Sequence, residues 1–360
     1  MYDSISIKRF RQFDSFELPK LTRVNLLVGR NNAGKTSLLE AIEMLAWGGR
    51  VASLLRSPRR RGEVSADTNE ERPGRVEFDI RHLFHGHNLY DGASFELQAR
   101  TNGSATIVRC DIGKIPHDDS QLELITEGID LEPQIGLTIR GPENLEGVLL
   151  PVSAGGALMS EPLRRFAPSN QGSSPVVFLG TEGADAYSLQ LIWDRLVLTP
   201  EEDKVTAAMR IIEPSIERLA FVSRDRTSSV AFVKLAGQDE RVPLGSLGDG
   251  TRRLLALAIY LARAGGGVLL VDEIDTGLHY TTLESMWRFV IETARRLDVQ
   301  VFATSHSADC VRALAWLQSD APSLAAEVSV HRIERGLSVS IPYSSGDIET
   351  AARHHIEVRG

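Results

Sequence analysis

The order of apolar and polar residues predicts helices that alternate with strands near both ends of the chain. Near the N-terminus, Ile5 and Ile7 alternate with polar residues, which predicts a strand, and a turn and a second strand follow. We then expect a buried strand over 21–28 and a helix over 34–47. Near the C-terminus we expect helices over 251–264 and 281–297 and strands over 268–271 and 299–303. This alternation is typical of an α/β fold with a parallel sheet.

The middle of the chain has a different pattern. Glycine and asparagine turns separate short strands expected over 76–80, 94–100, 106–110 and 135–139, which predicts an antiparallel region. Residues 48–74 are polar and rich in Arg, Ser and Gly, which is typical of a mobile loop. Residues 141–175 contain turn signals without a clear element. From Ala184 a helical region is expected, with Thr199 capping a helix that starts at Pro200, and strand returns over 221–235.

A phosphate-binding loop is predicted between the strand 21–28 and the helix 34–47. The residues Gly29-Arg30-Asn31-Asn32-Ala33-Gly34-Lys35-Thr36 match GxxxxGK[ST], and Ser37 follows. The flanking strand and helix distinguish this motif from a chance glycine-rich turn. Backbone N–H groups of such a loop, together with the helix N-terminus, point at phosphate. We expect Lys35 to reach the β- and γ-phosphates and the Thr36 hydroxyl to bind Mg²⁺.

Two carboxylates follow the apolar strand 268–271. We expect Asp272 to hold Mg²⁺ beside Thr36, and Glu273 to act as general base toward the attacking water. Lys35 and Asp272 lie far apart in the sequence. Small kinases, GTPases and AAA+ motors place these two motifs much closer, so the spacing favours a head with a large insertion.

Two further segments carry candidate site residues. Ser246 and Gly248 precede the helix 251–264, and such a helix start is an anion-binding site. Because Lys35 already serves one phosphate group, we interpret this second site as serving the nucleotide of another subunit; a capped helix without ligand is the alternative. His306 follows the strand 299–303, where we expect it to contact the γ-phosphate or orient the water.

Composition excludes several classes of protein. Apolar residues make up 42% and charged residues 24%, which excludes a disordered or fibrous chain. With 40 basic and 48 acidic residues the net charge is -8, so nucleic acid would have to bind through a local patch. Two cysteines, Cys110 and Cys310, fit a reducing cytosol. No apolar run is long enough to span a bilayer, so we expect a cytoplasmic protein without a membrane partner.

Two clusters have weaker signals. A basic segment over 50–61 is able to touch a phosphate backbone, although a solvated loop is the alternative; its members are Arg50, Arg56, Arg59, Arg60 and Arg61. The histidines His82, His85 and His87 lack a neighbouring Cys or carboxylate to complete four metal ligands, so we interpret them as a surface turn.

Taken together, these motifs resemble the ABC-type ATPase superfamily, and within it the RecF/SMC-like branch. The segments GRNNAGKTSLLEAI, GSLGDGTRRLLALA, LLVDEIDTGLHY and FATSHS are similar to the stand-alone AAA/OLD-type ATPases of prokaryotes. The resemblance covers nearly the whole chain and is most specific over 1–47 and 240–310. It implies a P-loop NTPase head of ABC type that uses ATP and Mg²⁺, in which Ser246 and Gly248 of one subunit close on the nucleotide of the other.

The chain also departs from that pattern. The segment around Ser246 is not the LSGGQ of transporters. No glutamine is assigned to the loop that would bridge Mg²⁺ to the second lobe, and Gln134 and Gln171 are the candidates. OLD-type members fuse the head to a Toprim nuclease, but too few residues follow His306 for one. We therefore expect no nuclease activity, and we expect the tail 356–360 to close the head's own sheet.

The sequence thus predicts a single α/β head. Its nucleotide core would comprise 1–66 and 236–360, with an insertion over 67–235 that is β-rich over 67–150 and mainly helical over 151–235. The expected function is ATP hydrolysis in an ATP-clamped homodimer that powers or gates a DNA-directed process, defence or repair, with a partner effector such as a nuclease. The alternatives are a RecF-like DNA-binding repair ATPase and a regulatory scaffold with slow hydrolysis as a timer. The missing LSGGQ and the long insertion disfavour a transporter subunit.

Overall fold

A six-stranded sheet with the strand order β11-β15-β16-β3-β17-β18 forms the centre of the molecule. The computed structural model describes residues 1–360 except 67–75, 116–134, 154, 160–173, 226 and 354–360. The strands from β11 to β17 run parallel, and β18 is antiparallel to β17. The bounds are β3 Val24–Val28, β11 Val176–Leu179, β15 Val268–Val271, β16 Gln300–Ser305, β17 Val328–Arg332 and β18 Ile341–Tyr343. The predicted α/β class with a mixed sheet is confirmed.

Most residues of the central strands β3, β11, β15 and β16 are apolar because both faces of the sheet are covered. Successive side chains of a strand point to opposite faces. Accordingly Leu26 and Val28 of β3 pack into one hydrophobic core, while Leu27 between them packs into the other. On β16, Ala303 and Phe302 divide between the two cores in the same way.

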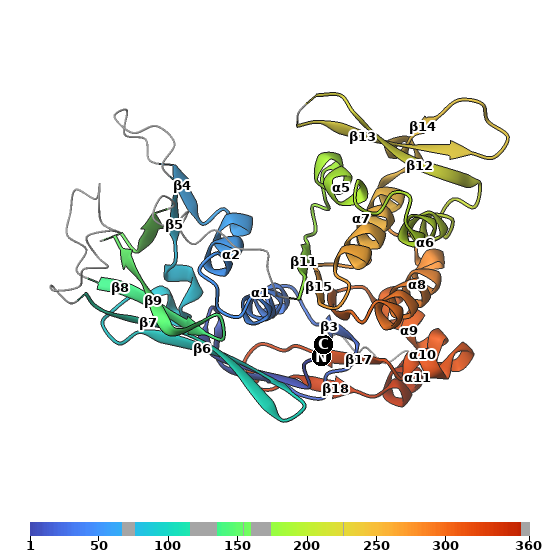
Figure 1. The fold of residues 1–360 in the computed structure, drawn as a ribbon. Helices are drawn as coiled ribbons and strands as arrows, with labels where there is room; N and C mark the ends of the chain where they lie inside the picture. The colour runs from blue at the N-terminus through green and yellow to red at the C-terminus, as the bar shows by residue number, and fades with distance from the viewer. Residues whose placement is uncertain (67–75, 116–134, 154, 160–173, 226, 354–360) are drawn as a thin grey trace.

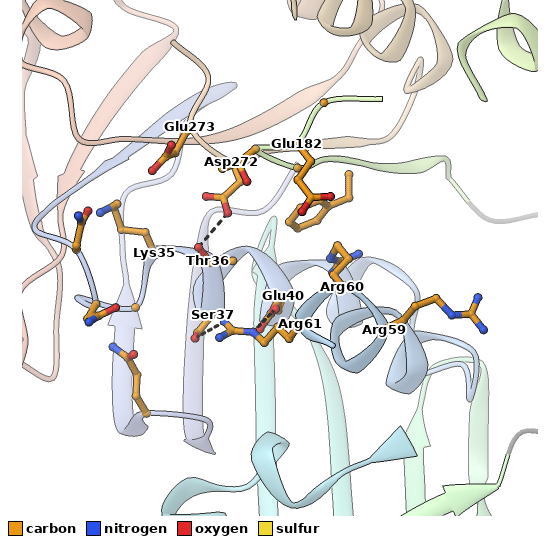
Figure 2. Close-up of a pocket in the computed structure, with 18 residues that line it drawn as sticks. Lys35, Thr36, Ser37, Glu40, Arg59, Arg60, Arg61, Glu182, Asp272 and Glu273 are labelled. Atoms are coloured by element: carbon orange, nitrogen blue, oxygen red, sulfur yellow. Dashed lines mark hydrogen bonds and ion pairs between the residues drawn. The ribbon is translucent and has the colours of Figure 1, made fainter. Parts of the chain in front are cut away.

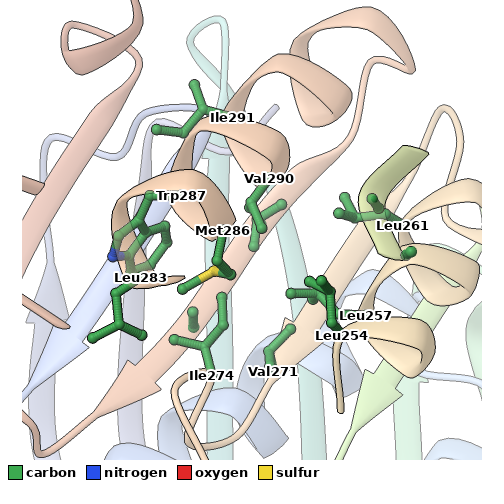
Figure 3. Close-up of a cluster of buried hydrophobic side chains, with 14 of the residues drawn as sticks. Leu254, Leu257, Leu261, Val271, Ile274, Leu283, Met286, Trp287, Val290 and Ile291 are labelled. Carbon is green, nitrogen blue, oxygen red and sulfur yellow. The ribbon is translucent and has the colours of Figure 1, made fainter. Parts of the chain in front are cut away.

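Helices cover the first of these faces (Figure 1). The leucines Leu254, Leu257 and Leu261 of α7 and the residues Met286 and Val290 of α8 are buried together in one core (Figure 3). The helices that contribute to this side are α5 Ala186–Trp193, α6 Pro200–Met209, α7 Asp249–Arg263, α8 Leu283–Arg296, α9 Ala308–Asp320, α10 Pro322–Ala325 and α11 Ser345–Arg353. The cap predicted for α6 is present, since the Thr199 hydroxyl accepts from the backbone N–H of Glu201.

The second face packs on the helix α1, Lys35–Ala46, which a second six-stranded sheet covers from the other side. This sheet is antiparallel, with the order β2-β1-β6-β7-β8-β9. Its strands are β1 Ser4–Phe10, β2 Phe13–Leu18, β6 Ser94–Thr101, β7 Ser104–Lys114, β8 Ile135–Gly141 and β9 Asn144–Val152. The helix that follows the phosphate loop is thereby fixed between two sheets.

Two three-stranded sheets complete the fold. One contains β4 Val64–Ala66, β5 Val76–Asp79 and β10 Ala157–Met159, and the other contains β12 Ile216–Ser223, β13 Ser229–Leu235 and β14 Val242–Pro243. Short 3-10 turns span Arg81–Leu83, His85–His87, Leu244–Leu247 and Tyr280–Thr282. Among the described residues, no helix combines the length and apolar character required to cross a bilayer.

The described part of the segment 48–74, residues 48–66, is not the mobile loop that its composition predicted, and 67–74 lie outside the described residues. It contains the helix α2, Ser53–Arg61, followed by β4. The arginines of α2 stabilise the helix against α1, because Arg61 pairs with Glu40 at 2.7 Å and Arg60 pairs with Glu43. Both glutamates are about 2% exposed, whereas the arginines reach solvent, so these ion pairs lie at the edge of the core.

The sheets do not follow the predicted boundaries of the insertion. Residues 151–235 were expected to be mainly helical, yet their described part contains β10, β11, β12 and β13 besides the helices α5 and α6. The strand β11 belongs to the central sheet, where it pairs with β15. In turn β1, from the predicted nucleotide core, pairs with β6 of the predicted insertion. The tail 356–360 lies outside the described residues, and β18 is the edge strand next to β17.

Candidate active site

Four of the parallel strands end at one edge of the central sheet, and the segments that follow them meet there. The phosphate loop follows β3, residues 180–183 follow β11, Asp272 and Glu273 follow β15, and His306 follows β16. Except for His306, these segments line a cavity of about 860 Å³ (Figure 2), which is within the usual range for a small-molecule site. The carboxyl edge of a parallel sheet is where α/β proteins bind ligands.

The phosphate loop supplies the floor of this cavity through Asn31, Asn32, Gly34, Lys35, Thr36 and Ser37. The Lys35 Nζ donates to the carbonyl oxygens of Gly29 at 2.6 Å and Arg30 at 2.9 Å. Burial lowers the pKa of Lys35, while the nearby carboxylates of Glu273 and Asp272 oppose this shift. The ammonium group thus lies beside acceptors that a phosphate is able to replace.

Glycine is required at two positions of the loop. Gly34 has a φ of 102°, and a Cβ there would lie 2.2 Å from Gln12 Nε2 and 2.5 Å from Phe13 Cζ. Gly29 has a φ of 153°, and a Cβ there would lie 2.3 Å from the carbonyl oxygen of Ile333. Any side chain would therefore push the loop away from β2 or from the segment after β17.

Thr36 and Asp272, the two residues predicted to hold a metal, are in contact. The Thr36 Oγ1 donates to Asp272 Oδ2 at 3.0 Å, and Asp272 Oδ1 accepts from Thr304 Oγ1 at 2.6 Å. A hydroxyl with one carboxylate suits Mg²⁺, which takes few protein ligands and completes its shell with phosphate oxygens and water. No group of three or more His, Cys, Asp or Glu suited to a metal occurs in the described part of the chain.

Glu273 has a left-handed backbone conformation, with φ 50°, that is unusual for a residue other than glycine. Its backbone N–H donates to Thr304 Oγ1 at 2.8 Å. Its carboxylate Oε1 lies 3.2 Å from His306 Nδ1. Glu273 and His306, which the sequence placed in one reaction, are therefore in contact, although His306 does not line the cavity itself.

The opposite wall of the cavity comes from α2 and from the segment after β11. Arg59, Arg60 and Arg61 line this wall together with Phe178 and Glu182 (Figure 2). The guanidinium of Arg60 lies 3.8 Å from the centre of the Phe178 ring, a cation–π contact. The loop 180–183 thus brings a glutamate, not a glutamine, into the site. The candidates Gln134 and Gln171 lie outside the described residues.

Ser246 and Gly248 are not among the residues that line the cavity. Ser246 belongs to the 3-10 turn Leu244–Leu247, and Gly248, with φ 97°, is the N-cap of α7. The first turn of α7 packs against the loop after Glu273, since a Cβ on Gly250 would lie 2.6 Å from the carbonyl oxygen of Gly277. The helix start thus contacts the loop that follows Glu273 and does not line the cavity.

Three functional residues were not predicted from the sequence: Gln12, Thr304 and Arg253. Gln12 lines the cavity from the turn between β1 and β2. Thr304 had a detectable signal, because a hydroxyl at the end of β16 lies beside Asp272 at the end of β15 when the strands are parallel. Arg253 lies in the segment GSLGDGTRRLLALA, but its contacts depend on tertiary packing that the sequence does not reveal.

The two weaker clusters make contacts with neighbouring residues. His82 Nδ1 lies 3.1 Å from His87 Nδ1, and His85 Nδ1 lies 2.9 Å from the carbonyl oxygen of Arg11. Arg50 pairs with Glu143 at 3.0 Å, and Arg56 lies 3.8 Å from Glu43. The exposed Arg59 lies 5.5 Å from the centre of the Phe78 ring.

Two family models match parts of the chain. One, described as "AAA ATPase domain", matches residues 1–97, and the other, described as "AAA domain, putative AbiEii toxin, Type IV TA system", matches residues 196–309. The first match contains the phosphate loop, and the second contains Ser246, Asp272, Glu273 and His306. Both motif regions of the cavity thus fall within ATPase family models.

Three known proteins are similar to this chain. An "ATP/GTP phosphatase" of Helicobacter pylori (strain ATCC 700392 / 26695) is 20% identical over 340 residues, which is 87% of each chain. A "DNA replication and repair protein RecF" of Xanthomonas oryzae pv. oryzae (strain MAFF 311018) is 50% identical over 44 residues, which is 12% of each chain. The structure of an Smc head bound to the C-winged helix domain of ScpA has a TM-score of 0.51 at 14% identity, covering 95% of this chain and 97% of that one. This last likeness concerns the fold alone.

Proposed function

We propose how this chain, an ATPase of the RecF/SMC-like branch, binds its nucleotide. Lys35 exchanges the carbonyl oxygens of its own loop for oxygens of the β- and γ-phosphates, and the N–H groups at the start of α1 bind the same oxygens. Thr36 and Asp272 hold Mg²⁺, which neutralises charge on the phosphates.

Hydrolysis then uses the pair formed by Glu273 and His306. The Glu273 carboxylate takes a proton from water as the water oxygen attacks the γ-phosphorus, and the bond from that phosphorus to the β-phosphate oxygen breaks. His306, 3.2 Å from the carboxylate, orients Glu273 and the γ-phosphate. This proposal rests on one observation: the Thr36–Asp272 contact and the Glu273–His306 contact lie at the same edge of the sheet.

Glu273→Gln tests the assignment of the general base. The variant should bind Mg-ATP like the wild type but hydrolyse it roughly 10²–10⁴-fold more slowly, because the amide does not accept the proton. Glu292→Gln, which changes an exposed carboxylate on α8, is the matched control. Phosphate release by Glu273→Gln at the rate of this control would contradict the role.

We further propose that ATP clamps two copies of the chain head to head. Ser246 and Gly248 begin a helix of 15 residues outside the cavity of their own subunit, so this anion-binding end is available to the nucleotide of a second copy. Identical heads facing each other generate two equivalent sites, and ATP then favours association by mass action.

Light scattering of Glu273→Gln with and without Mg-ATP tests the clamp. The dimer should accumulate when ATP is bound and not hydrolysed. Ser246→Arg should abolish this dimer and leave nucleotide binding by the monomer intact. A mass that stays the same with and without ATP would mean that another surface holds any assembly.

The clamp would serve a DNA-directed process, defence or repair, through a partner effector such as a nuclease. The similarity of a stretch of 44 residues to RecF favours a second candidate, a repair ATPase that binds DNA itself. The ion pairs between α2 and α1 occupy Arg60 and Arg61, which leaves fewer cations for a phosphate backbone. Salt-dependent DNA binding by the purified chain would favour the second candidate, and its absence would favour a partner that contacts DNA.

A further inference from the structure

Arg253 of α7 connects three segments of the active site. Its side chain is buried, with about 6% of the residue exposed. The Nη1 donates to the carbonyl oxygen of Gly180 at 2.5 Å, and the Nη2 donates to the carbonyl oxygens of Asp272 at 2.6 Å and Glu273 at 2.9 Å. One guanidinium thus joins the segment after β11, the end of β15 and the helix that begins at Gly248.

These acceptors are backbone carbonyls, so Arg253 acts on the chain and not on the nucleotide. Its planar guanidinium donates in fixed directions, which a flexible ammonium does not reproduce. Burial lowers the pKa of Arg253, and the nearby carboxylates of Asp272, Asp275 and Glu273 oppose the shift. A buried arginine that is bonded to two strand ends fixes the distance between them.

Glu273 needs such a restraint. A left-handed conformation is unfavourable for a residue other than glycine, so it persists only where neighbouring groups hold it. Thr304 binds the N–H of Glu273, and Arg253 binds its C=O. The peptide groups on both sides of the Glu273 side chain are therefore held, one from β16 and the other from α7.

We propose that Arg253 is a positioning residue that couples the start of α7 to the carboxylate of Glu273. The proposal rests on the clamped dimer described above. In that dimer, the nucleotide of the partner contacts Ser246 and Gly248, less than two helical turns before Arg253. A shift of this helix start moves the guanidinium, and with it the backbone of Glu273 and the loop 180–183. Closure on the second nucleotide then sets the general base of the first subunit in place.

The test is Arg253→Met, with Arg263→Met as the matched control. Arg263 is an exposed arginine in the last turn of the same helix. For Arg253→Met we expect ATP affinity by calorimetry and ATP-dependent dimerisation by light scattering to match the control. The kcat should fall on the order of 10²-fold, as expected for a misplaced catalytic group, and KM should change little. A kcat equal to that of the control, or a loss confined to ATP affinity, would overturn the proposal.

Arg253→Lys keeps the test decisive if the methionine variant does not fold. An ammonium keeps the charge but does not span Gly180 and the end of β15 together, so kcat should fall about 10-fold with KM unchanged. A lysine variant with the kcat of Arg263→Met would also overturn the proposal. A wrong dimer proposal would give a different result from a wrong role for Arg253. In that case Mg-ATP would not dimerise Glu273→Gln, although Arg253 is intact in this variant.

Discussion

Replacing Thr304 by valine should lower both the stability of the protein and its apparent affinity for Mg²⁺, and the two effects are measured separately. Thr304 is fully buried on β16, and its hydroxyl contacts both strand-end carboxylate residues. It accepts from the Glu273 N–H at 2.8 Å and donates to Asp272 Oδ1 at 2.6 Å. Valine has nearly the same shape, so the change removes these two hydrogen bonds and leaves the packing in place.

The magnitude follows from the two groups that lose a partner. A buried N–H without an acceptor costs about 1–3 kcal/mol, and a hydrogen bond to a charged group contributes about 1.5–3 kcal/mol. Asp272 still accepts from Thr36, which offsets part of the second loss. We expect the free energy of unfolding to fall by about 3 kcal/mol in urea titrations followed by circular dichroism.

The catalytic readout is the dependence of ATP hydrolysis on Mg²⁺ concentration. Thr304 orients the carboxylate that holds the metal, and loss of such a partner typically weakens metal binding 10- to 100-fold. The midpoint of the Mg²⁺ titration should rise by about 10-fold in Thr304→Val. Thr304→Ser keeps the hydroxyl and should have nearly the wild-type midpoint. If valine and serine give equal midpoints and equal unfolding free energies, the hydroxyl does not organise this site.

Two other substitutions and one nuclease assay test separate parts of the molecule. Lys35→Ala should abolish ATP binding in calorimetry, because it removes the cation that faces the phosphates; unchanged affinity would refute the assignment. Burial lowers the pKa of His331 from 6.5 to about 4, so the unfolded chain binds a proton that the folded chain does not. Protonation of His331 therefore does not lower the free energy of unfolding above pH 6.5, but lowers it by about 3 kcal/mol as the pH drops to about 4. His331→Asn should make the free energy of unfolding from urea titrations less dependent on pH in this range. The purified chain should leave plasmid DNA intact with Mg²⁺ or Mn²⁺, because Asp272 and Glu273, the strand-end carboxylate pair predicted from the sequence, serve ATP; nicking that persists through further purification would contradict this.

The phosphate loop and the acidic strand end were predictable because each is a local pattern. The residues Gly29–Thr36 form their loop wherever a strand precedes them and a helix follows, and the apolar run before Asp272 reflects a strand that is buried on both faces. The contact of Glu273 with His306 was also predictable, since both residues follow neighbouring parallel strands.

The helix α2 was not predictable from its own residues. Serine, proline and a run of arginines favour a solvated loop, and Pro58 lies inside the helix. Its stability comes from partners elsewhere, namely Glu40 and Glu43 on α1. Likewise β11 has only four residues, and its place in the central sheet depends on pairing with β15, far along the chain. Long-range partners of this kind leave no trace in a local window.

The long insertion separates Thr36 from Asp272 in the sequence without separating them in space. In the central sheet β16 is the only strand between β3 and β15, and all three end at the same edge. In a parallel sheet all strands start at one edge and end at the other. A connecting segment of any length therefore preserves the site if it leaves the sheet at this edge and re-enters it at the opposite edge. The insertion is therefore free to build its own sheets, provided that one of its segments, 180–183, returns to the cavity. Arg253 contacts that segment through the carbonyl oxygen of Gly180 and the end of β15 through the carbonyl oxygen of Asp272. One side chain thus binds both the insertion and the strand that carries the carboxylates.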